Sequence, residues 1–169
     1  MTIIRKEGTH KDTDIDTKDM SLHDKLCLKA EEWLRSVNCK VTFNKQFKVY
    51  SENGELPDAI GWREGISILV EVITCRPYFL ADKSKAYRVY PETGMGDWRF
   101  YLCPEGVINC EDLPKGWGLL HMNTKGKHIY KIHGVPPNIA QWHTKKPFTG
   151  CKISENMMLV SALRRLDKC

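Results

Sequence analysis

The first regular pattern of apolar positions predicts an amphipathic helix over residues 22–37. Ser21 is a favourable N-cap, and Asp24 lies in the predicted first turn. At about 100° per residue, His23 projects into the same arc as the apolar side chains, so it either packs on the core or faces a site at the helix end. The apolar positions within this arc are Leu22, Leu26, Cys27, Ala30, Trp33, Leu34 and Val37.

Alternating and β-branched segments predict a sheet. Residues 39–50 alternate around apolar positions and form a strand, alone or as the first half of a hairpin. Residues 56–75 (LPDAIGWREGISILVEVITC) predict two strands joined by a tight turn at Glu64 and Gly65. Further strands are expected at 98–103, 116–122 and 128–133.

Two more helical segments complete the pattern. Pro77 suits the first turn of a helix that runs to about Arg88. Residues 154–166 predict an amphipathic helix near the C-terminus, whereas 136–150 is expected to be irregular. The order of helix, three strands, helix and then strands predicts an α/β fold with a mixed sheet rather than a doubly wound one.

Length and composition suggest one domain. The chain has 169 residues, of which 41% are hydrophobic and 28% charged, an ordinary composition for a globular protein. Residues 1–20 alternate Lys and Asp without apolar periodicity, so we expect a mobile N-terminal arm followed by a single domain over 21–169.

The cysteines and the apolar runs indicate a compartment. Seven cysteines, an odd number with no C-x-x-C pair, argue against a disulfide framework and a zinc ribbon. No run approaches the roughly 18 apolar residues of a membrane span, and no signal sequence is apparent. We therefore expect a cytoplasmic protein without membrane contact.

The hairpin turn brings two acidic residues together. A two-residue turn pairs position 63 with 66 and, continuing outwards, Asp58 with Glu71 on the same face. Like charges so placed repel each other, and a hard divalent cation such as Mg²⁺ between them would relieve the repulsion. Two alternatives stay open: each carboxylate has its own Arg or Lys partner, or a longer turn shifts the register.

Several segments together resemble the PD-(D/E)xK nuclease superfamily, in particular an uncharacterised bacterial and phage group within it. The resemblance spans about residues 22–122, and MLVSALRRL is similar to the C-terminal end of the group. It implies a restriction-endonuclease-like αβββαβ core with a mixed sheet and a C-terminal helix. The segments are LHDKLCLKAEEWL, PDAIGW, CRPYFLADK and RFYLCPEGVI, followed by LPKGWGLLHM.

The resemblance implies a metal-dependent DNA nuclease of phage or bacterial repair, recombination or defence. Asp58, Glu71 and the backbone carbonyl of Val72 would bind Mg²⁺ or Mn²⁺, and His23 would face the site from the first helix. In such an enzyme the metal ion activates a water molecule and stabilises the leaving oxygen.

Two positions depart from the pattern of the group. The motif lysine, two residues after Glu71, is Ile73 here, and the Asp of S-R-S-D-F is Tyr78, although Arg76 keeps the Arg. On the predicted helix that follows, Lys83 projects towards the sheet and Lys85 points away. Some members of the superfamily carry their lysine on this helix, so Lys83 is either a migrated catalytic lysine or a solvated surface residue.

Basic residues near the predicted site indicate a polyanionic partner. They can neutralise DNA phosphates without reading the base sequence, and the net charge of +5 agrees with this. The rival hypothesis is a degenerate nuclease fold that binds DNA or a protein partner without cleaving, and a homodimer is also open. The basic residues after the Glu71 strand are Arg76, Lys83, Lys85 and Arg88, and those on the preceding strand are Lys45 and Lys48.

Overall fold

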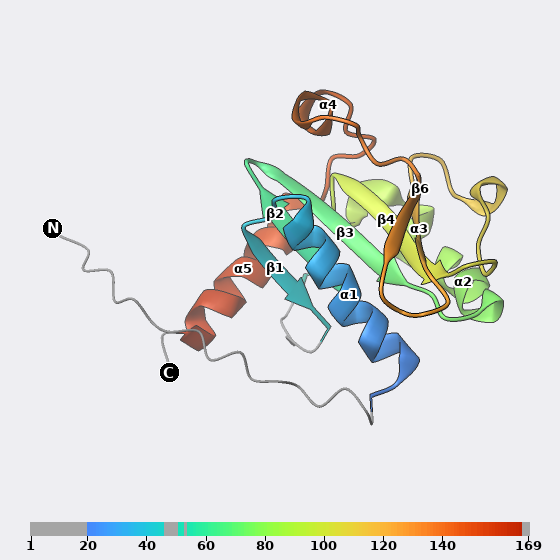
Figure 1. Cartoon of the computed structure of the whole chain (residues 1–169). Helices are drawn as coiled ribbons and strands as arrows, with labels where there is room; N and C mark the ends of the chain where they lie inside the picture. Colours follow the sequence, from blue (N-terminus) through green and yellow to red (C-terminus); the bar gives the residue numbers. More distant parts are fainter. Residues whose placement is uncertain (1–19, 46–50, 53, 167–169) are drawn as a thin grey trace, which may run out of the picture.

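A six-stranded mixed sheet forms the centre of the molecule (Figure 1). The computed structural model describes residues 20–45, 51–52 and 54–166, so the predicted arm, apart from Met20, and Lys48 lie outside the described residues. The strands are β1 (Val41–Asn44), β2 (Ala59–Arg63), β3 (Ile66–Val72), β4 (Trp98–Pro104), β5 (Gly118–Met122) and β6 (Ile129–His133). Neighbours follow chain order; β4 is parallel to β3 and to β5, and the other pairs are antiparallel. The mixed sheet is confirmed.

The β2–β3 hairpin has the predicted two-residue turn. Its pairing runs from Arg63 with Ile66 to Ala59 with Val70. Glu64 and Gly65 both have positive φ, 40° and 80°, as a type I′ turn requires. In this register Asp58 lies opposite Glu71, and the Val72 N–H donates to Asp58 Oδ2 at 2.9 Å. The structure thus has the predicted register rather than the shifted alternative.

Helices cover both faces of the sheet. Helix α1 (Leu22–Ser36) crosses one face (Figure 1), and Ser21 caps it by accepting a hydrogen bond from the Asp24 N–H. The predicted apolar arc is buried except for Leu22, which is exposed. Helices α2 (Arg76–Lys83) and α5 (Lys152–Leu166) pack on the opposite face.

Strand β3 is buried on both sides. Val70 and its alternate neighbours pack beneath α1, whereas Leu69 and Ile73 pack with Phe79 of α2 and Met158 of α5. Glu71 alternates with Val70 and therefore points to the α2 side. Within the ranges that the structure describes, no helix is long and apolar enough to cross a membrane.

The helix predicted over 77–88 is interrupted, so that prediction was wrong. Helix α2 ends at Lys83, and the Ser84 hydroxyl donates to the carbonyl of Ala81 at 2.8 Å. Such a local bond competes with helix continuation. Lys85 is extended, with ψ of 142°, and a separate short helix α3 (Ala86–Val89) follows.

Short elements connect the larger ones. The segment 136–150, predicted to be irregular, contains helix α4 (Ile139–Thr144), which Asn138 caps by accepting from the Gln141 N–H. Two 3₁₀ turns, η1 (Pro91–Thr93) and η2 (Cys110–Asp112), flank β4.

A buried carboxylate anchors α5 to the sheet. Glu155 Oε1 accepts hydrogen bonds from the Ser67 hydroxyl at 2.7 Å and from the Gly96 N–H at 3.0 Å. Its Oε2 accepts from Trp62 Nε1 at 3.3 Å and from Lys152 Nζ at 3.0 Å. These bonds join residues of β2, β3 and the loop before β4 through one side chain, so the predicted C-terminal helix is held in place by specific polar contacts as well as by packing.

Candidate functional site

A pocket of about 360 Å³ lies where β3 leads into α2. Its polar lining comes from five separate elements or connections of the fold, and Val72 and Ile73 at the end of β3 form part of its wall. The polar residues that line it are His23, Asp58, Glu71, Asp82 and Lys85. The structure therefore brings together His23, Asp58, Glu71 and Val72, as predicted.

Asp58 contacts both strand β3 and helix α1. Its Oδ2 accepts from the backbone of Val72, and its Oδ1 lies 3.3 Å from His23 Nε2. On the other edge of the imidazole, His23 Nδ1 lies 3.0 Å from Lys45 Nζ and 3.5 Å from Cys27 Sγ. His23 thus faces the site from the first turn of α1 and contacts Asp58 directly.

The ligand atoms of His23, Cys27 and Asp58 lie within 4.8 Å of one another, a spacing that raises the question of a metal ion. Asp58 and Cys27, however, contact opposite nitrogens of the ring, and one imidazole offers one nitrogen to a given ion. Burial also raises the pKa of the Cys27 thiol far above its ordinary value, and it is the thiolate that binds metals. Cys27 is therefore a poor third ligand beside His23 and Asp58.

Glu71 is buried in the wall of the pocket. Burial raises the pKa of its carboxyl well above the ordinary value, and nearby Asp58 and Asp82 act in the same direction, whereas Arg88 opposes the shift. Glu71 Oε1 pairs with Arg88 Nη2 at 2.8 Å. Its Oε2 has no hydrogen-bond or ion-pair partner among the described residues. Arg88 therefore engages one oxygen of this buried carboxylate.

Arg88 is buried, contrary to the expectation that it contacts DNA phosphates. Its side chain is 2% exposed and pairs with Glu55 at 2.6 Å, with Glu71 and with Asp82 at 3.0 Å. The guanidinium also lies 4.8 Å from the ring centroid of Trp117. The sequence showed only a basic residue at the end of a lysine-rich helix. Asp82 lies only six residues earlier, but Glu55 and Glu71 come from other segments of the chain, so the sequence did not indicate this role.

Lys85 lies in the pocket, contrary to the prediction, and Lys83 is the surface residue that the sequence offered as an alternative. Lys85 lines the pocket, with Nζ 2.7 Å from Asp82 Oδ1, although it was expected to point away. Lys83 lies outside the pocket, 3.4 Å from the carbonyl oxygen of Asp112. For Lys85 the cause is the break at Ser84, because the prediction assumed 100° per residue along one continuous helix. Lys83 lies within α2, with Nζ 5.3 Å from the ring centroid of Phe79.

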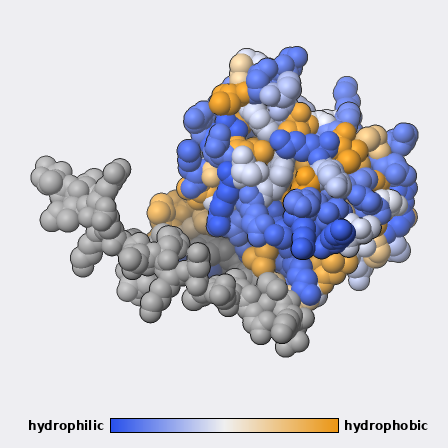
Figure 2. All heavy atoms as spheres, viewed as in Figure 1, coloured by the Kyte–Doolittle hydropathy of each residue, from blue (hydrophilic) through white to orange (hydrophobic). Residues whose placement is uncertain are grey.

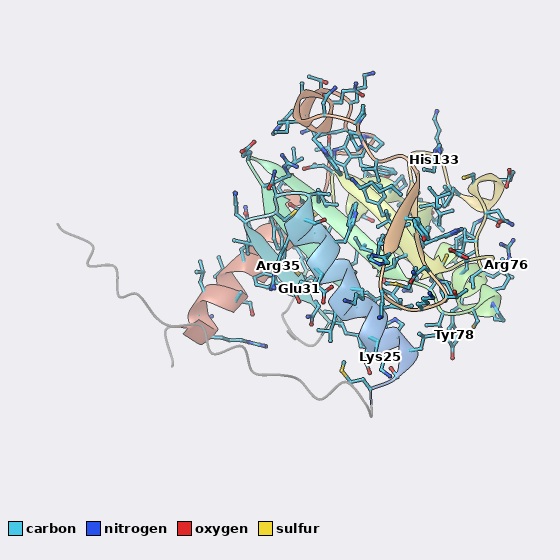
Figure 3. The ribbon with its side chains drawn as sticks, in the orientation of Figure 1. Lys25, Glu31, Arg35, Arg76, Tyr78 and His133 are labelled. Carbon is cyan, nitrogen blue, oxygen red and sulfur yellow. The ribbon has the colours of Figure 1, made fainter. Side chains whose placement is uncertain are left out.

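Arg76 and Tyr78 both lie on α2 at one side of the molecule (Figure 3). Arg76 makes two bonds of 2.5 Å to the carboxylate of Asp112, and its side chain is 46% exposed. This guanidinium holds the pKa of Asp112 well below its usual range. Arg76 can therefore meet a phosphate only beside, or in exchange for, that carboxylate.

The space-filling view shows a largely hydrophilic face over α1, interrupted by scattered apolar groups (Figure 2). The exposed basic residues that remain around the pocket are Lys45, Arg76, Lys83 and Lys85. Lys85 lines the pocket itself, whereas the other three lie outside its lining and Arg88 is withdrawn from the surface.

The sheet and the pocket define an α/β protein with a mixed six-stranded sheet and an acidic pocket at the end of its central strands. No protein-family model and no curated protein matches the chain. A solved structure, described as a protein of unknown function from Silicibacter pomeroyi, is similar with a TM-score of 0.60 and 20% identity. The match covers 88% of this chain and 90% of that one. At this identity the likeness shows the fold alone.

Proposed function

We propose that this protein is a metal-dependent nuclease that hydrolyses phosphodiester bonds in DNA. The observation that carries the proposal is the shared pocket, in which Asp58 and Glu71 face each other beside Val72, His23 and Lys85. The topology adds support. An antiparallel β1–β2–β3 meander followed by α2 and α3 and then by β4, parallel to β3, has the order of a restriction-endonuclease-like core.

The donor set fits Mg²⁺ or Mn²⁺. Asp58, Glu71 and the Val72 carbonyl would hold the ion through oxygen atoms, which these cations prefer. When bound, the ion would supply an activated water and polarise the phosphate. Lys85 takes the place of the missing motif lysine, since its ammonium group stands at the pocket where it can offset charge on a phosphate. His23 orients Asp58 through the 3.3 Å contact.

A second function is a nuclease fold that binds DNA or a protein partner without cleaving. Two observations favour it. Arg88 already pairs with Glu71 and so competes with a cation for that carboxylate. Ile73 stands at the position of the motif lysine and is buried among apolar side chains. It carries no charge that could pair with a phosphate.

The lysine assignment can be tested by a matched pair of substitutions. We expect Lys85→Ala to lower the rate of Mg²⁺-dependent cleavage by roughly 100- to 1000-fold, the usual effect of removing one group that stabilises transition-state charge. Lys83→Ala should leave the rate nearly unchanged. Single-turnover cleavage of a labelled oligonucleotide measures both. Equally small decreases in rate for the two variants would show that Lys85 does not take part in catalysis.

DNA binding should depend steeply on salt. If the roughly four exposed cations around the pocket each contact a phosphate, a fourfold rise in salt should weaken binding about 100-fold. Fluorescence anisotropy with oligonucleotides between low and moderate salt gives the slope. An absence of binding to single and double strands at low salt would contradict both DNA functions and point to a protein partner.

A further inference from the structure

Tyr78 is an aromatic side chain that stands open at the mouth of the pocket. It lines the same cavity as Asp58 and Glu71, yet it is 63% exposed. It forms no hydrogen bond or ring contact with any described residue. Figure 3 labels it on α2, low on the right of the view.

The rim around Tyr78 is apolar, in contrast to the acidic floor. Leu56, which precedes Asp58, also lines the pocket and is 64% exposed. The cavity therefore has carboxylates and a lysine within it and a phenol ring with an aliphatic neighbour at its edge. A ligand that suits both parts carries a phosphate, bound by metal and Lys85, joined to a flat, largely apolar group that can lie on the ring.

We propose that Tyr78 is a stacking platform for an unpaired nucleobase, so that the pocket selects single-stranded or locally opened DNA. The proposal rests on the proposed function, because the phosphate next to the stacked base is the one that would reach Asp58 and Glu71. Stacking on an aromatic side chain is sequence-tolerant, since every base has a π-face. In a duplex both faces of a base are already stacked on neighbours, so the ring would have to extrude a base first.

Binding without cleavage tests the platform directly. With a chelator present, we expect Tyr78→Ala to weaken the affinity for a single-stranded oligonucleotide by roughly 5- to 100-fold, the range that alanine substitution of a stacking aromatic produces. Tyr78→Phe keeps the ring face and should bind within about twofold of the native protein. Duplex affinity should be the same for all three proteins.

A matched control and a modified strand make the test specific. Tyr130 on β6 is also exposed, at 49%, but lies outside the pocket, so Tyr130→Ala should leave single-strand binding unchanged. On a strand with abasic sites throughout, Tyr78→Ala should have no effect, because no base remains to stack. Because Tyr78 is largely exposed and has no hydrogen bond or ring contact among the described residues, its substitution should not unfold the protein, which circular dichroism can verify.

The outcomes separate this inference from the proposed function. A loss on Tyr78→Ala that is equal for duplex and single strands, or that Tyr130→Ala reproduces, would overturn the platform. Metal-dependent cleavage together with a neutral Tyr78→Ala would also overturn it while leaving the nuclease intact. If Tyr78→Ala weakens only single-strand binding and the native protein never cleaves DNA, the platform would be supported and the nuclease function would be wrong.

Discussion

Replacing Arg88 with methionine should lower the free energy of unfolding by about 3–5 kcal/mol, the usual result of removing one partner from a buried ion pair. The change leaves Glu55, Glu71 and Asp82 without the cation that now pairs with all three. All three carboxylates are buried, so water cannot replace the guanidinium without opening the fold. Urea unfolding followed by fluorescence gives the difference.

Arg76→Met is the matched control for this experiment. Arg76 also forms an ion pair, with Asp112, but its side chain is 46% exposed. Its loss should therefore lower the free energy of unfolding by about 1 kcal/mol or less. Lowering the pH should restore part of the stability of the Arg88 variant, because protonation neutralises carboxylates that have lost the charge of Arg88. Arg88→Lys should recover only part of it, since an ammonium group cannot reproduce three separate contacts. A loss on Arg88→Met no larger than that of the control would show that the buried cluster contributes little.

Substituting either opposed carboxylate should remove metal-dependent cleavage. We expect Asp58→Asn and Glu71→Gln each to lower the rate roughly 100-fold or more, because each removes a charged ligand of the ion that stabilises the transition state. Both changes keep the shape of the side chain, so the pairing of β2 with β3 should persist. A Mg²⁺ and Mn²⁺ titration of cleavage measures the effect, and Glu32→Gln, an exposed change on α1, is the control.

The substitution Ile73→Lys distinguishes an active nuclease from a nuclease fold that has lost its activity. Ile73 follows Glu71 by two residues and lines the same pocket, so a lysine there can reach the position of the motif lysine. If the native protein is inert and this single change creates cleavage that Asp58→Asn abolishes, the protein binds without cutting. Cleavage by the native protein that survives Asp58→Asn would contradict the metal site altogether.

The hairpin was the most predictable part of the site. Its register follows from short-range chemistry, because Glu-Gly suits a turn with positive φ and the two strands alternate with period two. Asp58 and Glu71 could therefore be placed opposite each other without tertiary information. For α1, the N-cap and the apolar arc placed His23 in the first turn on the inner face, and only the resemblance implied that it faces the site.

The helix after β3 was less predictable, and the errors there have two causes. No Gly or Pro marks the break at Ser84, so continuing the helical period beyond it placed Lys85 on the wrong side. Arg88 depends on contacts with three carboxylates that lie 6 to 33 residues away in the chain. The burial of such a cation is decided by tertiary packing, which propensity and spacing do not report.

The anchoring of α5 by Glu155 has a consequence for the synthesis of the chain. Ser67 and Glu155 are 88 residues apart, so β2, β3 and β4 leave the ribosome well before the helix that covers them. Until α5 docks, the apolar surface beneath it is open to other nascent chains. Contacts over such long separations form late compared with local helices. This face of the sheet is therefore where a chaperone would protect the growing protein.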